Sequence, residues 1–310
     1  MVVAVAAGAG LGGVYNAPLA GMFFAVEILL VDVTLEKVAF GLGMSATAAF
    51  VATAIKGEHM FYDIGAMQMN STPSLMLFAL LCGTACGVVG ALFRKGSQWA
   101  ESHKPTGRSL MWQMPIAGLV TGLVSIVVPQ VMGNGRAAAQ LGFSTFIPET
   151  ADTSDAAQSA ASAAASPWTF LAGSDGAPGS VVNAGTPLEL NRLWMLLGVL
   201  ALTFVAKALV TLMTIRSGAS GGVLQPGIAL GSTLGTMLGL LWLFVFPVDS
   251  VTACALIGAA ALLSASQQAP LMAMCLVMEL TEAPFEFFVP VGMAVAASAF
   301  VSSGLLHRLG

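Results

Sequence analysis

The sequence predicts an all-helical integral membrane domain, and three observations support that fold class: the composition, the apolar segments and an internal repeat. Of the 310 residues, 57% are hydrophobic and only 8% are charged, and the mean hydropathy is +0.87. A soluble domain carries about 25% charged residues, so this chain has too few to solvate the surface of a globule. The formal net charge of −4 comes without a basic stripe or an acidic block, which argues against a nucleic-acid partner.

Apolar segments recur along the whole chain, and we predict that ten of them form helices that cross or enter the membrane. The longer segments have the roughly 17–25 residues that are needed to cross the hydrocarbon core. The shorter ones meet Gly-rich or Pro-containing breaks, and broken helices at membrane depth occur only where protein or a water-filled cavity satisfies the freed backbone groups. This pattern favours a transporter or a channel. The expected segments are 2–13, 16–31, 37–55, 74–93, 110–132, 191–214, 223–247, 251–264, 268–281 and 286–306.

The internal repeat consists of two short apolar segments that begin and end alike. Residues 17–27 open with Ala-Pro-Leu and close on Glu27, and residues 269–279 open with Ala-Pro-Leu and close on Glu279. Membrane transporters are often built from two related halves, with the ion site at the interface between them. We therefore expect a duplicated domain.

The connections between the segments predict the domain boundaries and the orientation. Residues 94–108 carry four Lys or Arg residues against Glu101, so the positive-inside rule places this connection in the cytoplasm. Residues 134–190 are acidic and rich in Ala, Ser and Gly, which bury little apolar area, so we expect an external loop insertion there. Residues 1–56 are assigned to the remainder of the first repeat, and residues 74–310 to the second repeat.

The chemistry is predicted at residues 217–226, where a glycine-rich stretch precedes an apolar helix. Glycine lets the backbone approach a ligand, and the first N–H groups of a helix have no partner within the helix. Those donors and the positive end of the helix dipole stabilise an anion without a full positive charge in the membrane. Gly-rich turns and close helix packing explain such a stretch at least as often, so the stretch alone leaves both interpretations open.

A family resemblance appears at these residues. Residues 218–226 read Gly-Ala-Ser-Gly-Gly-Val-Leu-Gln-Pro and resemble the second-half selectivity signature of the CLC family of chloride channels and chloride/proton antiporters. Residues 16–21, Asn-Ala-Pro-Leu-Ala-Gly, together with Glu27 resemble the first-half segment of that family. Residues 269–271 with the Glu-Leu-Thr-Glu at 279–282 resemble its second-half partner. The three signatures stand in the family's order, and the resemblance covers nearly the whole chain apart from the Ala/Ser-rich loop.

The resemblance implies a single all-α membrane domain over residues 1–310, with the inverted repeats of the CLC family and an anion pathway in each subunit of a homodimer. It implies chloride or a similar small anion as the transported partner, a multi-pass location in the cell membrane, and no cofactor. In the family, backbone amides of the second-half signature coordinate the anion. The matching positions are Val223 and Leu224, with Gly222 allowing the approach. Leu224 stands where Phe is usual, which leaves the donor in place but makes the anion preference uncertain.

Two family segments have no match in this chain. They supply the gating carboxylate and a serine ligand, and both precede the first Ala-Pro-Leu segment. We therefore expect the first half to be incomplete. This leaves open a non-conducting truncated remnant, or a fragment competent only for dimerisation, and also an unrelated solute transporter with inverted repeats.

Glu27 and Glu279 also leave two interpretations open. An ionisable residue inside a membrane often marks a proton or ion pathway, whereas a carboxylate can instead cap or bridge helix ends. In family antiporters that use an internal proton-transfer glutamate, that residue immediately follows the position of Glu27, and Ile28 stands there in this chain. An isoleucine cannot carry a proton, so we predict transport without tight proton coupling.

Neither an enzyme nor a metal site is expected from the side chains. The sequence shows no nucleophile with a matching base and no phosphate-binding loop. The four cysteines lie inside apolar runs. Cys82 and Cys86 fall on one helix face without His or carboxylate neighbours, so we interpret them as buried packing residues. The four cysteines are Cys82, Cys86, Cys254 and Cys275.

Overall fold

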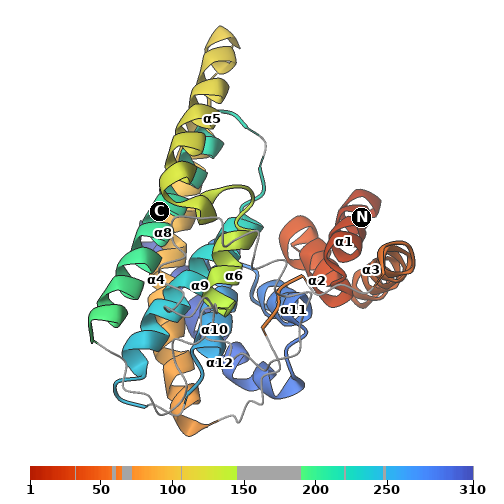
Figure 1. The fold of residues 1–310 in the computed structure, drawn as a ribbon. Coiled ribbons are helices and arrows are strands. Elements are labelled where there is room, and N and C mark those ends of the chain that lie inside the picture. Colours follow the sequence, from red (N-terminus) through yellow and green to blue (C-terminus); the bar gives the residue numbers. More distant parts are fainter. Residues whose placement is uncertain are drawn as a thin grey trace.

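The computed structural model describes residues 1–31, 33–57, 61–64, 72–105, 107–144, 190–219, 221–246 and 249–309. Helices are the only regular secondary structure in those ranges, which confirms the predicted all-helical class (Figure 1). The helices are α1 Val2–Tyr15, α2 Pro18–Phe23 with its π-helical continuation η1 Phe24–Leu30, α3 Leu35–Lys56, α4 Pro73–Ser102, α5 Leu110–Val127, α6 Arg136–Ser144, α8 Leu190–Arg216, α9 Leu224–Trp242, α10 Val251–Gln267, α11 Pro270–Thr281 and α12 Phe288–Leu309. Short 3-10 turns lie at Gly107–Ser109, Pro129–Val131 and Phe285–Phe287.

Each of the ten apolar segments predicted from the sequence coincides with a helix. Six helical stretches in the described residues are long and apolar enough to cross a membrane, and they belong to α3, α4, α5, α8, α9 and α12. The shorter apolar helices are α1, α2 with η1, α10 and α11. The loop insertion predicted at 134–190 differs at its start, because α6 occupies residues 136–144 and buries Ala138, Ala139 and Phe143. The remainder of that insertion, 145–189, lies outside the described residues.

The core is centred on α10, whose residues from Val251 to Ser266 are all buried. It packs against α9, α4 and α12. The contact with α9 is close because glycines face each other: a Cβ on Gly231 would lie 2.5 Å from the carbonyl oxygen of Gly258, and a Cβ on Gly258 would lie 2.5 Å from that of Gly231. Small residues let helix backbones approach in this way in membrane proteins.

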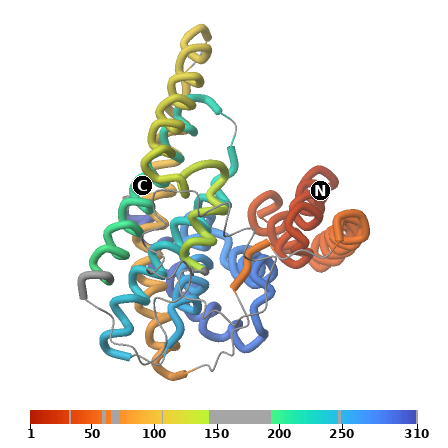
Figure 2. Tube along the Cα trace, in the orientation of Figure 1, coloured from red at the N-terminus to blue at the C-terminus, as the bar shows by residue number. Residues whose placement is uncertain are grey.

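The first three helices form a separate group at one side of this core. α1, α2 and α3 pack on one another, and α2 contacts α11 (Figure 1). The Cα trace shows the same arrangement, with the first 57 residues beside the chain from about residue 270 (Figure 2). The two Ala-Pro-Leu segments, which are far apart in sequence, are therefore neighbours in space.

Candidate functional site: the start of helix α9

The predicted anion site lies at a sharp turn between α8 and α9. The chain leaves α8 through Gly218, whose φ of +89° lies in the left-handed region that favours glycine. Val223 is the N-cap residue of α9, with φ −95° and ψ −2°, and Leu224 is the first helical residue. The structure thus places Val223 and Leu224 at the N-terminal end of a helix, where backbone N–H groups lack a carbonyl one turn earlier. Their donors and the helix dipole favour an anion there.

Gly222 borders this helix end, and a side chain there would have room. A Cβ on Gly222 or on Gly221 would meet no described atom within 4 Å. Packing against the described residues therefore does not explain why this position is a glycine. We predict that glycine is needed here so that a ligand can approach the backbone.

Gln225 adds a polar group to the same turn of helix. Its side chain is only 5% exposed, and its Oε1 accepts a 2.6 Å hydrogen bond from the hydroxyl of Tyr62. Its Nε2 is buried and has no hydrogen-bond partner among the described residues. Side chains in helices lean toward the N-terminus, so the amide of Gln225 leans toward the same end of α9 as the free N–H groups.

Tyr62 was not singled out by the sequence, although it is one of only two tyrosines in the chain. Its ring packs edge-on against Phe61 and Phe143, and its N–H donates to the carbonyl oxygen of Leu280. Burial raises the pKa of Tyr62, so its hydroxyl stays protonated and can donate to Gln225.

Lys207, on α8, is a second polar residue that the sequence reasoning missed. Its side chain is 3% exposed, and its Nζ donates to the carbonyl oxygens of Val131, at 2.9 Å, and Gly133, at 2.8 Å. An ionisable residue inside the apolar segment 191–214 was a signal that could have identified it, because such residues are costly in a membrane.

The two repeat glutamates lie away from α9, in a reciprocal arrangement between α2 and α11. Glu279, near the end of α11, accepts hydrogen bonds from the N–H groups of Leu19, at 2.9 Å, and Ala20, at 2.8 Å, at the start of α2. Glu27 accepts hydrogen bonds from the N–H groups of Leu271, at 3.2 Å, and Met272, at 2.8 Å, at the start of α11.

The proline at the start of each helix explains why each glutamate accepts hydrogen bonds from the N–H groups of the second and third helical residues. Pro18 and Pro270 occupy the first positions of α2 and α11, where proline fixes a helical φ and has no N–H to satisfy. The next two N–H groups lack partners in their own helix. A carboxylate that takes both satisfies them and complements the helix dipole. Both oxygens of each glutamate therefore take part in joining α2 with its continuation η1 to α11.

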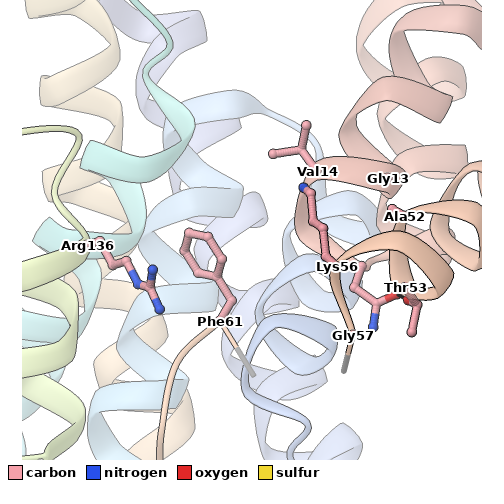
Figure 3. Close-up of a pocket in the computed structure, with 9 residues that line it drawn as sticks. Gly13, Val14, Ala52, Thr53, Lys56, Gly57, Phe61 and Arg136 are labelled. Atoms are coloured by element: carbon pink, nitrogen blue, oxygen red, sulfur yellow. Dashed lines mark hydrogen bonds between the residues drawn. The ribbon is translucent and has the colours of Figure 1, made fainter. Parts of the chain in front are cut away.

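A small cavity opens between α1, the C-terminal end of α3 and the start of α6 (Figure 3). It encloses about 140 Å³ and carries two cations, Lys56 and Arg136, and no acid among its described lining residues. The guanidinium of Arg136 lies 4.5 Å from the centre of the Phe61 ring. The lining residues are Gly13, Val14, Asn16, Ala52, Thr53, Lys56, Gly57, Phe61 and Arg136.

The cysteines make no metal site with the described residues, because no group of three or more His, Cys, Asp or Glu side chains comes together there. All four cysteines are free and buried. Cys82 and Cys86 lie one turn apart on α4 with their sulfur atoms 3.8 Å apart.

Comparisons with known proteins agree with this fold. The family model described as "Voltage gated chloride channel" matches residues 1–303. The chain is 27% identical over 292 residues to the H(+)/Cl(−) exchange transporter ClcA of Yersinia pestis, covering 90% of this chain and 50% of that protein. It is 28% identical over 293 residues to the voltage-gated ClC-type chloride channel ClcB of Salmonella typhimurium, covering 90% of this chain and 56% of that protein. The chain thus spans about half the length of the curated relatives it matches.

Solved structures show the same architecture. The crystal structure of a slow cyanobacterial Cl−/H+ antiporter matches with a TM-score of 0.71 at 21% identity, over 99% of this chain and 64% of that one. A CLC-type fluoride/proton antiporter matches with a TM-score of 0.64 at 18% identity, over 96% of this chain and 62% of that one. These identities support the fold alone, whereas the family model covers nearly the whole sequence. The chain therefore belongs to the voltage gated chloride channel family.

Proposed function

We propose that the chain carries chloride, or a similar small anion, across a lipid bilayer through a site formed by backbone N–H groups at the start of α9. The observation that carries this proposal is the position of Val223 and Leu224 at the N-terminal end of a 19-residue helix, next to the open space at Gly222. The names of the relatives, a chloride exchange transporter and a chloride channel, support the choice of anion.

The physical reason is the replacement of lost hydration. A chloride ion that enters the membrane gives up its water, and fixed N–H donors must replace those contacts. Backbone donors at a helix start are held by the helix itself, so they need no reorganisation when the ion arrives. Most of α9 is buried, which keeps water from screening its dipole.

Transport without tight proton coupling is part of the proposal. Ile28 cannot bind a proton, and both oxygens of the neighbouring Glu27 accept backbone N–H groups at the start of α11. The measurement is proton movement into liposomes under a chloride gradient. Uphill proton flux driven by chloride would contradict this part.

The assembly and location belong to the same proposal. We expect a multi-pass protein of the cell membrane that works as a homodimer, with residues 1–56 and 74–310 as parts of the two repeats. Chloride and lipid are its partners, and it catalyses no covalent reaction. Cross-linking of the purified protein would detect the dimer.

The backbone site can be tested by removing a single N–H group. Val223→Pro deletes one donor while Gly222, before it, can adapt, whereas Val223→Ala keeps the donor and serves as the matched control. A hydrogen bond to a charged group contributes about 1.5–3 kcal/mol, so chloride affinity should fall roughly 10- to 150-fold in Val223→Pro. Chloride efflux from liposomes, measured against chloride concentration with the protein from its complete reading frame, checks this. Equal affinities in the two variants would refute the backbone site.

A further inference from the structure

Lys207 lies on the core-facing stripe of α8, where the other side chains are uncharged. The core-facing residues of α8 recur at helical spacing and include Leu196, Leu200, Thr203 and Val210. Lys207 lies on this same stripe and is as buried as they are. Burying a lysine at such a place costs free energy, because its ammonium group loses its hydration. Buried ionisable residues in membrane proteins are therefore often functional.

The partners of Lys207 satisfy hydrogen bonds without cancelling charge. Its Nζ donates to the carbonyl oxygens of Val131 and Gly133, which are neutral dipoles. No carboxylate of the described residues lies within ion-pairing distance of this Nζ. A neutral donor could make the same two hydrogen bonds without the cost of a buried charge.

The side chain of Lys207 lies beside the first two turns of α9. Gly135, with a φ of +110°, brings three groups around the point that its Cβ would occupy: the Cβ of Ala229 at 3.1 Å, the Cε of Lys207 at 3.2 Å and the carbonyl oxygen of Gln225 at 3.4 Å. A helix rises about 1.5 Å per residue, so these α9 residues lie within two turns of Leu224. The ammonium group therefore lies on the order of 10 Å from the start of α9.

Three features that favour an anion therefore lie within the first two turns of α9 or beside them. They are the free N–H groups at Val223 and Leu224, the unpaired Nε2 of Gln225, and the charge of Lys207. Gln225 is only 5% exposed, and its Nε2 has no hydrogen-bond partner among the described residues. Among the described residues, no acidic side chain forms an ion pair that would neutralise Lys207.

We propose that Lys207 is the fixed positive charge that sets the anion affinity of the site at the start of α9. It acts through its electric field and does not touch the ion, so it is a positioning residue. This inference rests on the proposed function, because it assumes an anion bound at Val223 and Leu224. The competing explanation is structural: Lys207 would only tie the turn at 131–133 to α8 through its two hydrogen bonds.

Charge and hydrogen bonding can be separated by substitution. Lys207→Gln keeps hydrogen-bond donors and loses the charge, Lys207→Met loses both, and Lys207→Arg keeps both. Replacing a buried charge by an apolar side chain of similar volume is often tolerated, so Lys207→Met provides a second neutral variant if Lys207→Gln does not fold. Lys104→Gln is the matched control, because it removes a lysine whose partner is the exposed Glu101.

The protein from its complete reading frame is purified, and chloride binding is measured by calorimetry together with the unfolding temperature. Two unit charges about 10 Å apart at an effective dielectric constant of about 20 imply a roughly tenfold change in affinity. We expect the chloride Kd to rise about tenfold in Lys207→Gln and Lys207→Met, and to stay near the wild-type value in Lys207→Arg and Lys104→Gln.

Two outcomes would overturn the inference in distinguishable ways. Neutral variants with wild-type chloride affinity would leave the proposed function standing and refute the role of the Lys207 charge, as would a Lys207→Arg variant that binds as weakly as Lys207→Met. A wild-type protein that binds no chloride and moves none would refute the proposed function itself, and the inference with it.

Discussion

Replacing Glu279 or Glu27 by alanine should destabilise the protein, and by nearly the same amount at each site. Each carboxylate accepts one N–H from a fully buried residue, Ala20 or Met272, and one from a partly exposed residue, Leu19 or Leu271, which are 39% and 46% exposed. The starts of α2 and α11 are thus similar in burial as well as in sequence.

The magnitude follows from the groups left without a partner. A buried N–H without an acceptor costs about 1–3 kcal/mol. Removing a negative charge from a helix N-terminus costs about 0.3–1 kcal/mol more. We expect each alanine variant to lose about 2–3 kcal/mol of unfolding free energy, and the glutamine variants to lose less because one amide oxygen can still accept a hydrogen bond.

The assay is thermal unfolding of the purified protein in detergent, with chloride flux and proton flux measured on the same preparations. Glu101→Ala is the control, since Glu101 belongs to an exposed ion pair with Lys104 and such pairs contribute about 0–1 kcal/mol. The capping role would be refuted by Glu279→Ala and Glu27→Ala variants that unfold like the wild type. A loss of proton movement without a loss of stability would instead identify the glutamates as part of a proton route.

Two further predictions concern packing near the site and in the core. Tyr62→Phe should destabilise the protein by about 1–3 kcal/mol, because the buried Oε1 of Gln225 loses its only donor among the described residues. Tyr15→Phe is the control, and equal unfolding temperatures for the two variants would contradict the expectation. Gly258→Ala should cost about 1–3 kcal/mol through overpacking, because its new Cβ would meet the backbone of α9 at Gly231. Gly198→Ala should unfold at or slightly above the wild-type temperature, since open space surrounds that Cβ and alanine favours the helix. A Gly258→Ala variant as stable as Gly198→Ala would show that the helices can separate without cost.

The number and order of the membrane helices were predictable because apolar length is a strong signal in a bilayer. The helix ends were less predictable, for local reasons. α4 continues to Ser102, beyond the predicted 93, because Arg94 can stay in a helix by donating to the carbonyl oxygen of Ser266. α5 ends at Val127, before the predicted 132, because Pro129 follows and disfavours a helical residue before it.

The helix α6 was missed because of its composition. It has nine residues and begins at Arg136, so neither its length nor its polarity resembles a membrane segment. Its burial depends on contacts with α9 and α10, which come later in the chain. A local pattern cannot report such contacts.

Only the part of the candidate site that has a local sequence signal could be predicted. The start of α9 could be located because glycines followed by an apolar helix are a local signal. The proximity of Lys207 and Tyr62 to α9 depends on how α8 and the segment 61–64 pack. The reciprocal contacts of Glu27 and Glu279 were equally hidden, because the repeat shows that the two segments are alike but does not show that they face each other.

The reciprocal contacts also constrain the order in which this protein can mature during synthesis. α2 leaves the ribosome before α11, and the acceptor for the N–H groups of Leu19 and Ala20 is Glu279, which follows them by 260 and 259 residues. Until that residue is made, the start of α2 must rely on water, lipid headgroups or chaperones for its hydrogen bonds. The reciprocal contacts can form only once both α2 and α11 have been made, so the two helix starts gain their carboxylate acceptors in the same packing step.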